Sequence, residues 1–181
     1  DIQAIGQVYL GGMTTTQSGG SVEIGARLRA SQVISIQGGN NASGIGVKMP
    51  GGAQLSTTNP NGVIGIKATG DAEIYGMMAA GGKIIDRYDT RGQYVGSTAQ
   101  YGDGASQVHI MADHQIRLTR SIYAGSLIDL HGGLASIDQS LPFYDQGIVL
   151  GGTVSLKTGL EDSVINVSSL GNMILTAPAW T

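Results

Sequence analysis

The chain has 181 residues, of which 30 are glycine and none is cysteine, and its formal net charge is −3 at pH 7. A hydrophobic fraction of 41% argues against a disordered chain. The 10 Lys and Arg residues are scattered, which excludes the basic patch that nucleic-acid binding needs. No apolar run approaches the ~18 residues of a membrane span, and the absence of cysteine excludes disulfides, thiolate metal sites and cysteine nucleophiles.

Segments in which every second residue is apolar or small recur four times along the chain. The first is residues 22–30, and the longest, residues 64–81, follows it at an offset of 50. The third, residues 108–125, follows at an offset of 44, and the fourth, residues 154–164, at 46. Because side chains alternate between the two faces of a strand, this period predicts β-strands rather than helices. The fourth copy slips near its end, which predicts a β-bulge near Ser163.

The longest segment exceeds the length of a single straight strand. At ~3.3 Å per residue it would extend about 55 Å, whereas strands usually have about 3–10 residues. We therefore expect bends at small residues such as Gly70 and Gly81. A coil of three short strands takes roughly 20–24 residues, so each repeat of 44–50 residues holds one regular and one irregular coil. The irregular coils are expected at residues 37–62, 87–107 and 131–153.

Stacking these coils predicts an all-β fold, a parallel β-helix of about eight coils in four two-coil repeats. Neighbouring coils pair through backbone hydrogen bonds, and like residues stack in ladders inside the tube. The even-numbered aliphatic residues expected to share this interior include Ile66, Ile74, Ile110 and Leu118. We expect one β-helical domain over residues 1–181. Since the chain starts at Asp1 without a methionine, we expect an internal slice of a longer repetitive chain.

The repeat also resembles a known family. The pattern V-x-I-x-A-x-G-x-I-x-I-x-G-x-I-x-A-G-G-x-I is carried by residues 64–84 and 108–128, and more weakly by 22–36 and 154–174. It resembles the repeats of filamentous-hemagglutinin-type exoproteins and related giant bacterial surface adhesins. The resemblance covers roughly half the chain. It implies a right-handed β-helix, export across bacterial membranes, and a role in attachment or in building a surface fibre.

The aromatic residues, only 5% of the chain, are unevenly placed, with three tyrosines in one expected irregular coil and Phe143 and Tyr144 in the next. Exposed tyrosines on the flank of a β-helix would stack on sugars or contact a neighbouring chain. The candidate partner surface on this basis comprises Tyr88, Arg91, Tyr94, Tyr101, Phe143 and Tyr144. The alternative is that the loops pack these aromatic side chains against the β-helix itself.

No cofactor or metal site is predicted. A tandem Gly-Gly-x-Gly-x-Asp repeat would bind calcium ions, but Asp103 stands between two glycines in a single isolated copy. A zinc site needs three or four converging ligands, and no third ligand accompanies His109 and His114. We expect these two residues, together with His131, to be corner or surface histidines.

No catalytic residue is predicted either, and we expect a protein that is not an enzyme. Enzymes that cleave polysaccharides use paired carboxylates, and Asp86, Asp89 and Asp103 share one expected irregular coil. Convergence of these carboxylates in a groove beside Tyr88 or Tyr94 would favour a polysaccharide-active or carbohydrate-binding β-helix, which is the alternative function. A phage-type fibre is a further alternative and would form a trimer.

The leading hypothesis is a structural or adhesive rod segment of a large exported bacterial cell-surface protein or filament. It would act outside the cell and present its irregular coils sideways for attachment. Its expected partners are flanking coils of the same parent chain and a glycan or protein of a host or neighbouring cell. Neither nucleic acid nor a membrane span is expected.

Overall fold

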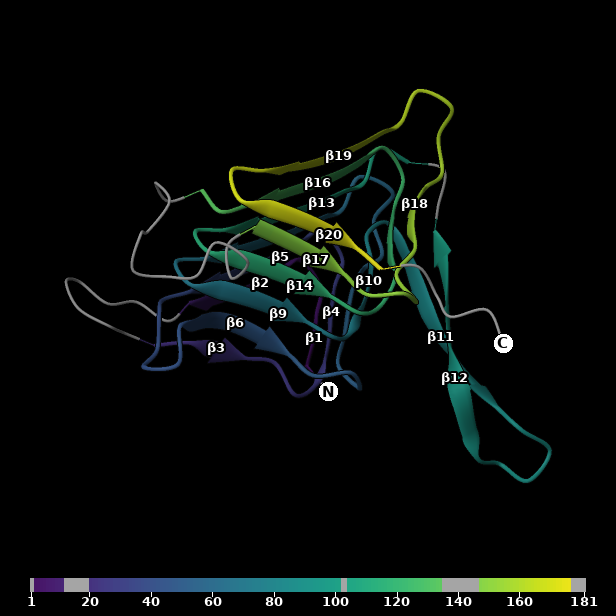
Figure 1. Ribbon diagram of the computed structural model, residues 1–181. Helices are drawn as coiled ribbons and strands as arrows, with labels where there is room; N and C mark the ends of the chain where they lie inside the picture. The colour runs from purple at the N-terminus through teal and green to yellow at the C-terminus, as the bar shows by residue number, and fades with distance from the viewer. Residues whose placement is uncertain (1, 12–19, 102–103, 135–146, 177–181) are drawn as a thin grey trace.

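The computed structural model describes residues 2–11, 20–101, 104–134 and 147–176. Regular structure in these ranges is entirely β, with twenty strands and no helix (Figure 1). Eighteen of the strands form three parallel six-stranded sheets, and the other two form an antiparallel hairpin. Within the described ranges no helix is long and apolar enough to span a membrane.

We name the three parallel sheets A, B and C. Sheet A contains β1 (Ile2–Ala4), β4 (Arg27–Ala30), β7 (Gln54–Thr57), β10 (Met77–Ala79), β15 (Ile122–Ala124) and β18 (Leu156–Thr158). Sheet B contains β2 (Gln7–Gly11), β5 (Val33–Gly38), β8 (Val63–Ala68), β13 (Gln107–Ala112), β16 (Leu127–Gly132) and β19 (Val164–Ser169). Sheet C contains β3 (Val22–Glu23), β6 (Ile45–Met49), β9 (Asp71–Ile74), β14 (Gln115–Leu118), β17 (Gly147–Leu150) and β20 (Asn172–Leu175).

The chain visits the three sheets in the repeating order A, B, C, and each passage adds one strand to each sheet. We call each such set of three strands a level. This organisation is that of a parallel β-solenoid and is consistent with the predicted parallel β-helix. Each sheet holds six strands, so the expected number of about eight coils is not confirmed.

Like residues stack in ladders along the inside of each sheet, as predicted. In sheet B, Ile66 pairs with Ile36 on one side and with Ile110 on the other, and Leu130 follows Ile110. The four aliphatic residues predicted to share the interior are all buried, including Ile110 at 0% exposure. Fully buried positions alternate with partly exposed ones along β5, β8, β13 and β16, which explains why the period-two pattern predicted the inward-facing residues.

The 44-residue offset does not correspond to two stacked coils, as was predicted, but to a single level that contains an insertion. Ile66 and Ile110, 44 residues apart, are direct neighbours in sheet B, whereas Ile110 and Leu130 are neighbours only 20 residues apart. The additional residues include an antiparallel hairpin, made of β11 (Gly82–Tyr88) and β12 (Tyr94–Tyr101). The expectation of an irregular coil over 87–107 was therefore wrong.

The insertion can be placed by register. Met78 pairs with Ile122 and Ala79 with Tyr123, so Ala80-Gly81 corresponds to Ala124-Gly125. Gln107 pairs with Leu127, so Ser106 corresponds to Ser126. Removing residues 82–105 from this level would therefore give the same Ala-Gly-Ser corner as the next level.

The other two expected irregular coils also contain regular strands. Residues 37–62 include all of β6 and β7, which pair in sheets C and A. Residues 131–153 include β17 of sheet C, and residues 135–146 of this stretch lie outside the described part of the chain. The turn-forming residues in these two stretches belong to the connections between strands, and they do not make a whole coil irregular.

The fourth predicted copy was placed in the wrong register. The 46-residue offset would stack Leu156 on Ile110, but Leu156 pairs with Ile122 in sheet A. Ile165 pairs with Ile128 in sheet B, without a shift of register along β19. The expected β-bulge near Ser163 is instead the corner between β18 and β19.

Small and polar residues shape the corners between sheets A and B. The Thr57 hydroxyl accepts a hydrogen bond from the amide of Gly81 at 3.0 Å, and Gly81 has a left-handed φ of 69°. One level on, Ser106 Oγ donates to the carbonyl of Ala80 at 2.8 Å and accepts from the amide of Gly125 at 2.7 Å. These buried hydroxyls satisfy backbone groups that would lack a partner where the chain bends.

Candidate functional site: an inserted hairpin and a polar hollow

The hairpin of β11 and β12 extends away from the three sheets (Figure 1). Its turn is held by Asp89, whose Oδ1 accepts hydrogen bonds from the amides of Arg91 at 2.9 Å and Gln93 at 2.8 Å. Gly92 takes a left-handed φ of 77°, which glycine adopts without steric cost. The Asp-Thr-Arg-Gly sequence thus forms a tight hairpin turn.

Asp86, which pairs with Ser97 in the half of the hairpin nearer the turn, fixes the hairpin to the outer face of sheet A. Its Oδ1 accepts hydrogen bonds from Ser97 Oγ at 2.7 Å and from Gln54 Nε2 at 3.0 Å. Its Oδ2 lies 2.6 Å from Arg27 Nη2. Ile84 is buried beside this contact at 7% exposure. The hydrogen bonds from Ser97 and Gln54, followed by the charge of Arg27, hold the pKa of Asp86 below its usual value.

We expect Asp86→Asn to lower the free energy of unfolding by about 1–2 kcal/mol at pH 7, because a carboxylate that accepts several hydrogen bonds is replaced by a neutral amide. A carboxyl whose folded pKa is depressed stabilises the fold above its unfolded pKa, and this stabilisation is lost as the pH falls through the lower folded pKa. The difference between the two proteins should therefore shrink below pH 3.8. Urea unfolding followed by circular dichroism at pH 7 and pH 3 measures it.

The matched control for this prediction is Asp162→Asn, at an exposed aspartate next to the corner before β19. We expect it to change the free energy of unfolding by less than about 0.5 kcal/mol at both pH values. An equal loss in Asp86→Asn at pH 7 and pH 3 would contradict a role for the charge of Asp86.

The outer part of the hairpin exposes aromatic and aliphatic side chains. The Tyr88 and Tyr94 rings meet edge to face, with centroids 6.1 Å apart. Both rings are more than half exposed, as is Val95, and Ile85 is 46% exposed. Tyr94 also hydrogen-bonds through its hydroxyl to Ser97, at 2.7 Å, which links it to the Asp86 cluster.

The predicted partner surface is brought together in part. Tyr88, Arg91 and Tyr94 lie together around the turn of the hairpin, and Arg91 is exposed. Tyr101 lies at the opposite end of β12, where its backbone pairs with Gly82. The last two predicted members, Phe143 and Tyr144, lie outside the described residues. Sequence reasoning missed Ile85 and Val95, although a turn sequence between two β-rich runs was available as a hairpin signal.

The carboxylates predicted as an alternative catalytic group serve separate structural roles where they are described. Asp86 faces sheet A and pairs with Arg27, whereas Asp89 closes the hairpin turn. Asp103 lies outside the described residues.

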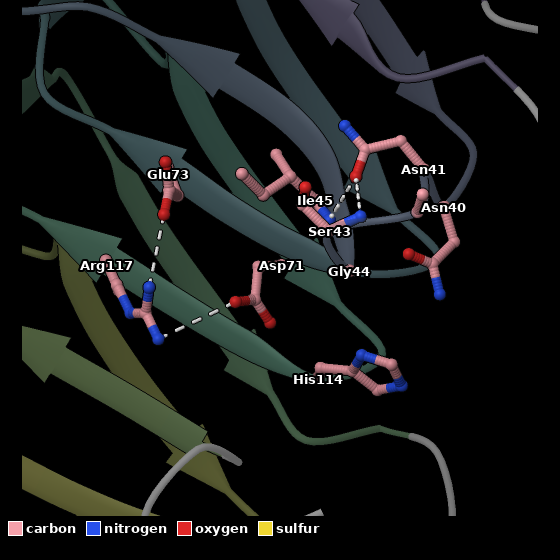
Figure 2. A pocket seen from close by; sticks show the side chains of 10 residues that line it. Asn40, Asn41, Ser43, Gly44, Ile45, Asp71, Glu73, His114 and Arg117 are labelled. Carbon is pink, nitrogen blue, oxygen red and sulfur yellow. Dashed lines mark hydrogen bonds and ion pairs between the residues drawn. The ribbon is translucent and has the colours of Figure 1, made fainter.

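A polar hollow of about 550 Å³ lies on the outer face of sheet C (Figure 2). Three segments build it: β9, the start of β14 with the corner before it, and the loop between β5 and β6. The lining residues are Asn40, Asn41, Ala42, Ser43, Gly44, Ile45, Asp71, Glu73, His114 and Arg117. Sequence reasoning did not predict this group, because its members are brought together by register between strands.

Opposite charges face one another across two neighbouring strands in the hollow. Arg117 Nη1 lies 3.1 Å from Glu73 Oε1, and Arg117 Nη2 lies 3.7 Å from Asp71 Oδ2. The backbone amide of Gln115 donates to Asp71 Oδ1 at 3.2 Å. Burial raises the pKa of Asp71, against the opposing effects of Arg117 and of the amide hydrogen bond. Lys48 pairs in register with Glu73 from the other side, so charges alternate along the ladder.

The loop that forms the upper wall is ordered by Asn41. Its Oδ1 accepts hydrogen bonds from the amides of Ser43 at 2.9 Å and Ile45 at 3.0 Å (Figure 2). Gly44 provides a left-handed φ of 80° in the same turn. The neighbouring Asn40 has a buried Oδ1 without a hydrogen-bond partner among the described residues.

The outer face of sheet B carries a row of histidine and aspartate. Asp129 Oδ1 lies 2.8 Å from His131 Nε2, and Asp129 Oδ2 lies 3.4 Å from His109 Nδ1. Asn166 donates to the same aspartate at 2.8 Å, and His131 hydrogen-bonds to Ser168. Asp129 and His131 are two residues apart on one strand and therefore lie on the same face, so their pairing could have been predicted from the sequence. In the described part of the chain, no group of three or more His, Cys, Asp or Glu residues is placed to hold a metal ion.

Comparison with protein-family models, with curated proteins and with solved structures found no match to this chain.

Proposed function

We propose that the chain is a non-enzymatic structural and adhesive segment of a large exported bacterial surface protein or filament, acting outside the cell. Its three parallel sheets would close into a right-handed β-helix, the hand that crossover connections between parallel strands strongly prefer. Further coils of the parent chain would continue the stack at its ends. A phage-type fibre is a competing hypothesis that predicts a trimer.

The observation that carries the proposal is the inserted hairpin. The insertion interrupts an otherwise regular level, and its two described strands, β11 and β12, pair with each other and join none of the three stacked sheets. The insertion keeps Tyr88, Tyr94 and Val95 exposed, although burying them inside the solenoid would be favourable. Asp86 ties the hairpin to Arg27 and Gln54 of sheet A close to the turn, so the exposed residues are held in one place. A solenoid that carries a fixed hairpin with exposed aromatic side chains suits attachment to a partner.

The test is a variant that lacks residues 82–105 and joins Gly81 directly to Ser106. Fluorescent beads coated with either protein are applied to cultured epithelial cell monolayers, and the attached beads are counted. We expect the variant to keep the circular dichroism of a β-protein and to lose at least about nine-tenths of the attachment, since the hairpin supplies the partner-facing side chains.

A second variant keeps the test decisive if the deletion perturbs folding. Tyr88→Ala with Tyr94→Ala removes the aromatic pair and the hydrogen bond of Tyr94 to Ser97, and keeps the contacts of Asp86 with Ser97, Gln54 and Arg27. The matched control is Tyr9→Ala, which removes an exposed tyrosine from the outer face of sheet B. Attachment that survives in the double variant, or wild-type beads that do not attach, would overturn the proposal.

One observation favours the second candidate function, a carbohydrate-binding β-helix. The polar hollow on sheet C combines carboxylate, guanidinium, amide and imidazole groups in one concave site (Figure 2). Such a mixture suits recognition of hydroxyl groups.

A further inference from the structure

We propose that the polar hollow on sheet C binds a neutral polyhydroxylated ligand, a saccharide of one or two sugar units. The inference rests on the second candidate function, a carbohydrate-binding β-helix, and names the ligand class of its site; it is independent of the hairpin, which packs on sheet A and takes no part in the hollow. The volume of about 550 Å³ falls within the ~300–1,000 Å³ that is usual for small-molecule sites.

The hollow retains hydrogen-bonding capacity that the fold does not use. Asp71 Oδ2 lies 3.7 Å from Arg117, beyond hydrogen-bond distance, while its other oxygen is held by the amide of Gln115. The His114 imidazole has no hydrogen-bond partner among the described residues. Asn40 Oδ1 is buried and likewise has no hydrogen-bond partner there. Buried polar groups normally have hydrogen-bond partners, so the unpaired Asn40 Oδ1, in the same hollow as the part-exposed Asp71 and His114, points to a ligand rich in hydroxyls.

The charges in the hollow exclude other ligand classes. An anion would be repelled by Asp71 and Glu73, and the Arg117 guanidinium that would attract it already lies between these two carboxylates. A metal ion lacks a suitable set of ligands among the described residues. An apolar ligand would leave the carboxylates and amides desolvated without partners, which is costly. A neutral ligand with paired hydroxyls can donate to Asp71 and both donate to and accept from Asn40.

The groups are also held in place before any ligand arrives. Asp71 and Glu73 lie on β9, which is hydrogen-bonded between β6 and β14. The loop that carries Asn40 is closed by two hydrogen bonds to the side chain of Asn41. Pre-ordered groups lose little conformational entropy on binding, which favours recognition of a small ligand.

The test uses saturation-transfer NMR of the whole chain with three neutral disaccharides, maltose, cellobiose and lactose. Galacturonate and glucosamine serve as charged comparators. We expect at least one neutral sugar to give a signal stronger than both charged sugars. In Asp71→Ala and in Asn40→Ala, the Kd of that sugar should rise at least about tenfold, because each variant removes an acceptor that a hydroxyl needs.

The matched control is Asp129→Ala, which removes a partly buried carboxylate from sheet B and should leave sugar binding unchanged. Retained circular dichroism of the variants separates lost binding from lost folding. The inference is overturned if none of the neutral sugars binds, if a charged sugar binds more strongly, or if Asp71→Ala and Asn40→Ala bind as the wild type does. Sugar binding should persist in the chain lacking residues 82–105, so failure here and failure of the proposed hairpin attachment are distinguishable.

Discussion

Replacing Ile110 by alanine is expected to lower the free energy of unfolding by about 2–5 kcal/mol, the range for truncating a fully buried aliphatic side chain. Ile110 has 0% exposure and stacks between Ile66 and Leu130 in the ladder of sheet B. Strands on both sides hold their backbones in register, so the cavity left behind can collapse only in part. Urea unfolding followed by circular dichroism measures the loss.

The control for this prediction has the same chemistry in the last level of the solenoid. Ile174 in β20 is 39% exposed, and Ile174→Ala should cost less than about 1 kcal/mol. Equal losses at the two positions would show that the inner ladder does not carry the stability of the fold.

The second large effect is expected at the corner between sheets B and C. A Cβ atom on Gly132 would lie 2.1 Å from the carbonyl oxygen of Gly147, which is closer than real Cβ contacts allow. Gly132→Val should therefore force the two backbones apart and lower the free energy of unfolding by about 3 kcal/mol or more. A thermal melt and urea unfolding of the purified variant would report this loss.

Gly65→Val provides the comparison, because Gly65 lies in the middle of β8, on the outer face of sheet B, the sheet that also contains Gly132. No atom lies within 4 Å of a Cβ placed there. Valine is favoured in strands and glycine is not, so we expect unchanged or slightly higher stability. Comparable destabilisation by both variants would refute the explanation by close backbone approach.

Most of the interior could be predicted from the sequence. The period-two pattern identified Ile66, Ile74, Ile110 and Leu118 as inward-facing, and all four are buried. The 44-residue offset also predicted the register between β8 and β13. Side-chain alternation is a local property of a strand, and stacking identical strands repeats it, so both signals survive in the sequence.

The size of a coil could not be predicted in the same way. The number of residues from one level to the next varies along this solenoid. It is 20 from Ile110 to its neighbour Leu130, but 44 from Ile66 to its neighbour Ile110, because the hairpin is inserted between Ile66 and Ile110. The fourth copy illustrates the same difficulty, since aliphatic residues match equally well at several offsets. Only backbone pairing decided that Leu156 belongs beside Ile122 in sheet A.

The two parts of the candidate site differ in the same respect. Tyr88, Arg91 and Tyr94 are close in sequence, and a tight turn keeps them close in space, so their grouping was predictable. Asp71 and Arg117 are 46 residues apart and lie together because β9 and β14 pair, while Asn40 lines the same hollow from a third segment. Nothing in the sequence indicated that Asp71, Arg117 and Asn40 would line one hollow.

The sequence by itself determined that the chain forms short strands with one apolar face and glycine at the bends, because alternation and backbone sterics act within a few residues. Only the tertiary structure decided which strands are neighbours, that β11 and β12 form a hairpin outside the three sheets, and that the hollow exists. These features depend on register between distant segments. Register is set by the collective pairing of six strands in each sheet, which no local stretch of sequence specifies.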